Sequence, residues 1–220
     1  MSALNVYLAP DQIQVWTDGA LYDADGTLLS VNTKVAPLPH LNAVVALRGP
    51  GLALPLLAHH LGTFPSFDAL IAELVPAIQE AWTVHESIFD MCSHGPDFEL
   101  VVAGWSGQHG CPEAYAWKSA EPLIVHKLGP VTIAPGAEVI SQLMRAEFPA
   151  LSDSSDLSDQ AIWRRLMELQ RETIRLEQVE GAGAICAVGA FCQLTTITSS
   201  RTTTEIVRRW PDRVGEKMGG

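Results

Sequence analysis

The sequence contains no apolar run long enough to cross a lipid bilayer. Its longest apolar runs, such as residues 43–47 and 52–58, fall far short of the roughly 20 residues that a membrane-spanning helix needs. Residues 1–10 have neither a basic start nor a long apolar stretch, so they do not have the pattern of a secretory signal peptide. We therefore expect a protein without a membrane partner.

Basic residues are scarce, and cysteine is rarer still. The chain has 14 Lys and Arg against 25 Asp and Glu, a net charge of −11, which argues against nucleic-acid binding because that binding depends on cations that contact phosphate. The four cysteines show no spacing typical of a disulfide framework: Cys92, Cys111, Cys186 and Cys192. Reduced thiols in a cytoplasmic protein are the simplest interpretation.

The remaining composition indicates an ordinary globular chain. Hydrophobic residues make up 47% of the 220 residues, which is enough for a large core and argues against disorder. We find no internal repeat and no low-complexity linker. The sequence therefore predicts one domain that spans residues 1–220.

Period-2 and helical patterns alternate in blocks along this domain. Strands are predicted at residues 5–9, 12–17, 27–35, 43–47, 98–105, 113–118, 123–126, 131–134, 184–199 and 202–209. Helices are predicted at residues 51–61, 66–82, 136–148 and 159–176, with Ser66 and Ser158 as N-caps and a kink at Pro76. Two packed sheets with helices on both outer faces would bury every apolar face of this order. The prediction is an α+β fold, a four-layer α-β-β-α sandwich.

Three polar residues near the N-terminus carry the clearest chemical signal. Ser2, Asp18 and Lys34 follow one another at intervals of sixteen residues, and Ser2 becomes the first residue once Met1 is removed. A terminal serine carries a hydroxyl nucleophile and an α-amine of pKa about 7.7–8.0 that can accept the hydroxyl proton. A nearby lysine can lower the pKa of the hydroxyl, and an aspartate can hold that lysine in place.

The segments around these residues, Val-Trp-Thr-Asp-Gly at residues 15–19 and Val-Asn-Thr-Lys-Val at residues 31–35, resemble the N-terminal-nucleophile hydrolases. The similarity is greatest to proteasome β-subunits and to the peptidase of the bacterial two-component proteasome-like protease. Residues 100–117 and 188–197 resemble later parts of the same family. The resemblance implies the sandwich fold, amide-bond hydrolysis without a cofactor or metal, a ring-like homo-oligomer and a separate ATP-driven unfoldase.

The same resemblance implies a role for each site residue. Ser2 is the expected nucleophile, Lys34 its activator, Asp18 the partner of Lys34, and Gly49 the N–H donor to the oxyanion. Supporting serine and aspartate residues of the family are replaced at Ala134-Pro135-Gly136, Ile185 and Val188, and Pro50 has no N–H. These departures favour an alternative, a non-catalytic assembly or scaffold subunit.

Two other motifs suggest metal chemistry. Residues 22–29 resemble the nucleophile motif of haloacid-dehalogenase-type phosphatases, which would make Asp23 the nucleophile of a Mg²⁺-dependent enzyme. The residues before Asp23 make a poor buried strand, so a hairpin turn is the favoured interpretation. Cys92 and His94 match His109 and Cys111 as zinc ligand types, but a strand separates the two pairs and places them at opposite ends of a hairpin.

Overall fold

The computed structural model describes residues 2–23, 25–90, 98–149, 157–176 and 185–219, and their strands form four sheets. The first large sheet has the order β10-β1-β2-β13-β14 and is antiparallel throughout. Its strands are β1 (Leu4–Leu8), β2 (Gln12–Asp18), β10 (Val131–Thr132), β13 (Phe191–Thr198) and β14 (Thr202–Arg209).

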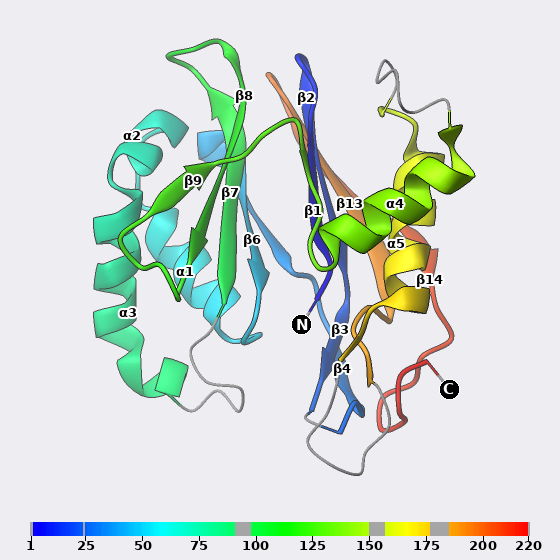
Figure 1. Cartoon of the computed structure of the whole chain (residues 1–220). Coiled ribbons are helices and arrows are strands. Elements are labelled where there is room, and N and C mark those ends of the chain that lie inside the picture. The colour runs from blue at the N-terminus through cyan, green and yellow to red at the C-terminus, as the bar shows by residue number, and fades with distance from the viewer. Residues whose placement is uncertain (1, 24, 91–97, 150–156, 177–184, 220) are drawn as a thin grey trace.

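The second large sheet has the order β5-β6-β7-β8-β9 and is also antiparallel. Its strands are β5 (Val35–Leu38), β6 (Ala43–Arg48), β7 (Glu99–Ser106), β8 (Cys111–Lys118) and β9 (Val125–Lys127). One inner cluster joins the two sheets, because Leu4, Val6 and Val15 of the first pack with Val44 and Val101 of the second. This burial of apolar surface holds the two large sheets face to face (Figure 1).

Each large sheet also packs against its own helices. Helices α1 (Ala53–Leu61), α2 (Phe67–Ala72) and α3 (Leu74–Asp90) share a buried cluster with β5, β6, β7 and β8. Helices α4 (Ala137–Glu147) and α5 (Gln160–Thr173) share another with β2 and β13, and a short 3₁₀ helix, η1 (Pro39–Leu41), precedes β6. In the described part of the chain, no helix combines the length and apolar character that a membrane span requires.

The predicted four-layer α-β-β-α sandwich is wrong as a description of this chain, which is sheet-rich and mostly antiparallel. Two additional small sheets take up strand-forming residues: β3 (Ala20–Tyr22) pairs with β4 (Leu28–Val31), and β11 (Arg175–Leu176) pairs with β12 (Ile185–Cys186). The hairpin with its turn at Asp23 consists of β3 and β4, which pair with each other. The predicted strand at 27–35 is therefore divided between β4 in this small sheet and β5 in a large sheet. A sandwich of two sheets does not account for this division of the strands.

Two predicted helix features also differ from the structure. Ser66 does cap a helix, since its Oγ accepts from Ala69 N, but that helix stops at Ala72 and a new one begins at Leu74. Pro76 therefore lies in the first turn of α3, where its missing N–H has no helical partner, and the one non-helical residue within α3 is His85. Asp159, and not Ser158, caps α5 by accepting from Ala161 N.

Candidate active site at the chain N-terminus

The structure brings Ser2, Asp18 and Lys34 together, and the N-terminus lies between the two large sheets (Figure 1). The antiparallel pairing of β1 with β2 places Leu4 opposite Thr17. Ala3, which follows Ser2, therefore lies beside Asp18, the last residue of β2. Lys34 directly precedes β5 of the facing sheet. The two intervals of sixteen residues thus correspond to one hairpin and one crossing between sheets.

The side chain of Lys34 connects the other two residues. Its Nζ donates to Asp18 Oδ1 at 2.6 Å and to Ser2 Oγ at 2.7 Å. All three residues are buried, with exposed fractions of 5% for Ser2, 0% for Asp18 and 6% for Lys34. A hydroxyl, an amine and a carboxylate are therefore held within hydrogen-bond distance and away from bulk water.

Asp18 is fixed by four donors. Its Oδ1 accepts from Ala3 N at 3.0 Å as well as from Lys34, and its Oδ2 accepts from Ala20 N at 3.2 Å and Gly189 N at 3.1 Å. Three backbone N–H groups and one charged donor satisfy this buried carboxylate. The orientation that Asp18 presents to Lys34 therefore depends on three separate chain segments.

Arg48, at the end of β6, holds the main chain of Ser2. Its Nε donates to the Ser2 carbonyl oxygen at 2.8 Å, and its Nη1 donates to Glu99 Oε2 at 2.6 Å. Arg48 and Glu99 are direct cross-strand partners in β6 and β7, so the register of the sheet aligns their side chains. With Ala3 N bound to Asp18, the peptide group that follows Ser2 is held at both its oxygen and its nitrogen.

Burial shifts the pKa values of several groups at this site. It lowers the pKa of Lys34, the charge and hydrogen bond of Asp18 oppose that effect, and the positive charge of Arg48 lowers the pKa further. Burial, with the negative charge of Asp18, raises the pKa of Cys192 to about 12 and that of Tyr22 well above its usual value. The lowered pKa makes the neutral amine of Lys34 more accessible than that of an exposed lysine.

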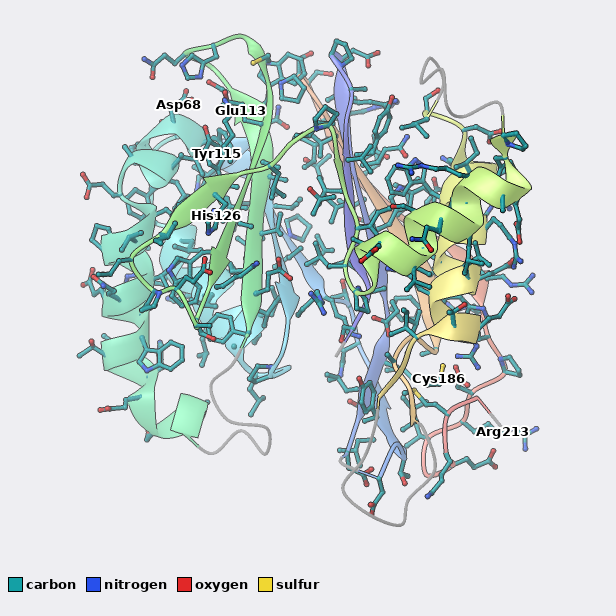
Figure 2. The ribbon with its side chains drawn as sticks, in the orientation of Figure 1. Asp68, Glu113, Tyr115, His126, Cys186 and Arg213 are labelled. Atoms are coloured by element: carbon teal, nitrogen blue, oxygen red, sulfur yellow. The ribbon has the colours of Figure 1, made fainter. Side chains whose placement is uncertain are left out.

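A cavity of about 490 Å³ adjoins this site. Its lining includes Arg48, Glu99, Lys118 of β8 and His126 of β9. Of these four residues, Figure 2 labels His126. Residues 132–137, which lead into α4, also line it and are mostly apolar. The same arginine that holds the Ser2 carbonyl therefore forms part of a space large enough for a peptide side chain.

The turn at residues 134–136, where the resembled family has a serine, is held by a buried amide pair. Asn5 Oδ1 accepts from Ala134 N at 3.1 Å, and Gln170 Nε2 donates to Pro135 O at 3.0 Å. Asn5 Nδ2 in turn donates to Gln170 Oε1 at 2.8 Å. These contacts order one wall of the cavity without placing a hydroxyl beside Ser2.

Gly49, the predicted oxyanion donor, directly follows Arg48 and is exposed to solvent. Its φ of 137° lies in a region that only glycine adopts readily. Among the residues that the structure describes, no hydrogen bond joins Gly49 to Ser2. Gly49 is therefore near the site in sequence, and its position as an oxyanion donor stays a prediction.

The other sequence motifs lie away from this site. Asp23 Oδ1 accepts from Asp25 N at 3.0 Å and from Thr27 N at 2.9 Å, so its carboxylate stabilises the turn between β3 and β4. Cys92 and His94 lie outside the described residues. Within the described ranges, no group of three or more potential ligands is placed to hold a metal ion.

Arg48 is the site residue that the sequence did not reveal. It directly precedes Gly49, the predicted oxyanion donor. An arginine at a strand end carries no motif, and the position of its guanidinium follows from a pairing with β7 that is 51 residues away in the chain. The strand register of β6 and β7 is the signal that would have identified it.

Comparison with protein-family models and with curated protein sequences finds no match for this chain. The site must therefore be judged from its own geometry.

Proposed function

We propose that this chain is an N-terminal-nucleophile hydrolase that cleaves amide bonds with Ser2 after Met1 is removed. The observation that carries the proposal is the position of Lys34 Nζ, which lies 2.7 Å from Ser2 Oγ and 2.6 Å from Asp18 Oδ1. A lysine buried between a serine hydroxyl and a carboxylate stabilises negative charge that develops on that hydroxyl.

In the proposed first step, Ser2 Oγ attacks the carbonyl carbon of the amide and its proton passes to the α-amine of Ser2. A carbon–oxygen bond forms, and the carbonyl π electrons move to the oxygen. Lys34, held by Asp18, stabilises the charge on Oγ as the proton leaves. The contacts of Arg48 and Asp18 with the peptide group after Ser2 support this step, because they hold the residue that carries both nucleophile and base.

The tetrahedral intermediate then collapses, the carbon–nitrogen bond breaks, and the α-ammonium returns its proton to the leaving amine. Water attacks the resulting ester on Ser2, with the α-amine accepting its proton, and releases the acid. The Gly49 N–H is the proposed donor to the oxyanion in both halves of the reaction. Loss of one such donor costs on the order of a hundred- to thousand-fold in rate.

The substrate is proposed to lie in the cavity that Arg48 lines, with an amide that reaches Ser2 from that side. A ring-like homo-oligomer, an ATP-driven unfoldase partner and a cytoplasmic location belong to the same proposal. Free thiols at Cys111, Cys186 and Cys192 support a reducing compartment.

The test is intact-mass analysis with peptide mapping of untagged protein after incubation with a β-lactone, an electrophile that acylates activated hydroxyls. We expect one adduct, on Ser2 of a chain without Met1. Ser2→Thr should retain the adduct because it retains a hydroxyl beside the α-amine. Ser2→Ala should lose it, and Ser200→Ala, a change at an exposed serine, should behave as the unaltered protein.

A chain that keeps Met1, or loses it and stays unmodified, would contradict the proposal and favour the non-catalytic assembly subunit. An adduct on another residue that persists in Ser2→Ala would also contradict it.

A further inference from the structure

The segment that places the Gly189 N–H against Asp18 is held from its other side by an ion pair outside the site. Arg171 of α5 and Asp212 of the C-terminal segment form two parallel hydrogen bonds, Nη1 to Oδ2 at 2.8 Å and Nη2 to Oδ1 at 2.7 Å. Both side chains are largely buried, and the guanidinium also lies over the ring of Trp210. This fork-to-fork geometry is the strong form of an ion pair.

The pair binds the main chain on both sides of Gly189. Arg171 Nη1 donates to the carbonyl of Val188 at 2.8 Å, and Asp212 Oδ2 accepts from Ala190 N at 2.7 Å. Gly189 itself donates to Asp18 Oδ2, and its carbonyl accepts from Gly19 N at 3.1 Å. Residues 188–190 therefore connect the ion pair to Asp18, which holds Lys34.

Two backbone features show that this segment needs support. Ala190 has a φ of 65°, a left-handed conformation that is unfavourable for a residue with a Cβ atom. At Gly189, an added Cβ would lie 2.9 Å from Asp212 Oδ2 and 3.2 Å from Arg171 Nη1, so only glycine allows the ion pair to approach this closely. The strained conformation persists because Asp212 and Trp210 bind the N–H and C=O of Ala190.

We propose that Arg171 and Asp212 are positioning residues of the Ser2 site, acting through Gly189 and Asp18 on Lys34. The inference rests on the proposed function for its kinetic consequence. It makes the reactivity of Ser2 depend on a contact made at Asp212, 210 residues further along the chain. The resembled sequence pattern gives no such role to either residue.

The direction of the effect follows from the charges that face Lys34, which are Asp18 and Arg48. Without the Gly189 N–H, Asp18 keeps more negative charge toward Lys34 and favours its ammonium form, so the pKa of Lys34 rises. Because Lys34 acts as the ammonium in the proposed mechanism, the loss of Ser2 acylation rate at high pH should begin at a higher pH than in the unaltered protein. A displacement of about 1 Å at a reacting group costs up to roughly a hundred-fold in rate.

The experiment measures the second-order rate constant of β-lactone acylation of Ser2 against pH, together with the melting temperature. The variants are Asp212→Asn, Arg171→Gln and the conservative Arg171→Lys, in full-length protein from which Met1 has been removed. The matched control is Arg165→Gln, which removes an arginine of the same helix whose partners are Glu147, Glu168 and Glu172.

We expect acylation to be about 10- to 100-fold slower in Asp212→Asn and Arg171→Gln, with the pH profile displaced upward, and an intermediate rate in Arg171→Lys. The control should keep both the rate and the profile. Variants that melt like the control and retain the unaltered rate and pH profile would overturn the inference.

A second measurement separates this inference from the proposed function. Among the 17 glycines of ¹⁵N-glycine-labelled protein, the Gly189 amide should have a downfield shift because it donates to a carboxylate, and Arg171→Lys, which keeps the charge, should move it. If unaltered protein is never acylated, the proposed function fails. The chemical shift of the Gly189 amide still decides whether the Arg171–Asp212 ion pair holds Gly189 against Asp18. A Gly189 shift that no variant changes would overturn the inference whatever the acylation shows.

Discussion

Replacing Lys34 with methionine tests the site most directly. Methionine fills a similar volume, but it removes the ammonium that donates to Ser2 Oγ and Asp18 Oδ1. Asp18, fully buried, would keep only its three backbone donors, Ala3, Ala20 and Gly189. A buried carboxylate without its cation is among the more costly defects that one substitution can create.

The size of the effect follows from this partial compensation. Removing one partner of a buried ion pair costs about 3–5 kcal/mol, and the three remaining N–H donors place Lys34→Met near the lower end, at about 3 kcal/mol. For a chain of this size, that loss lowers the melting temperature by roughly 6–12 °C. Acylation of Ser2 should fall by about 10²- to 10³-fold, the usual contribution of one group that stabilises developing charge.

The assay combines thermal unfolding, followed by circular dichroism, with the rate of β-lactone acylation measured well below both melting temperatures. The control is Lys217→Met, the same change at an exposed lysine, which should leave both quantities unaltered. A Lys34→Met protein that melts with the control would refute the energetic argument. One that is acylated at the unaltered rate would refute the chemical argument.

Three other changes have definite expected outcomes. Arg48→Gln removes the donor to the Ser2 carbonyl and leaves Glu99 without its cation, so chemical denaturation should show a loss of about 1–3 kcal/mol. The pKa of Lys34 is below 10.5 in the folded chain, so at high pH the unfolded chain binds more protons than the folded one. The free energy of unfolding, measured by urea denaturation, should therefore rise as pH approaches 10.5. This rise should be absent from Lys34→Met. Cys192, with a pKa of about 12, should react with a thiol reagent at least about 100-fold more slowly than the partly exposed Cys111, and equal rates in peptide mapping would refute its burial.

The relation between Ser2 and Asp18 could be found from sequence because one hairpin joins them, whereas the chain crosses to the other large sheet between Asp18 and Lys34. The interval from Ser2 to Asp18 corresponds to the β1–β2 hairpin, in which position along one strand fixes position along the other. The strands themselves followed from alternation of apolar residues, and β1, β2, β6, β7 and β14 lie close to their predicted ranges.

The sandwich was predicted wrongly because periodicity identifies a strand but not the sheet to which the strand belongs. Residues 27–35 read as one strand, yet β4 pairs with β3 and β5 pairs with β6. Similarly, the apolar stripe from Leu70 to Ile78 continues across the break between α2 and α3, so the pattern alone gave one helix. Pairing choices of this kind are decided by contacts between distant segments.

The residues that hold the site in place were missed for the same reason. Arg48, Arg171 and Asp212 carry no motif, and each acts on a segment brought near by tertiary structure. An arginine–aspartate pair 41 residues apart is indistinguishable, in the sequence, from many exposed pairs. Their roles depend on strand register and helix packing that a single sequence does not specify.

The hydrogen bond from Gly189 to Asp18 joins residues 171 positions apart, and it has a consequence for biosynthesis. Ser2 and Asp18 are translated before β13, so β2 has no β13 beside it until residues 191–198 have been made. A nascent chain would therefore carry its serine in an unassembled and chemically ordinary state. The order of synthesis would therefore delay completion of the contacts around Asp18 until the segment with Gly189 has folded against β2.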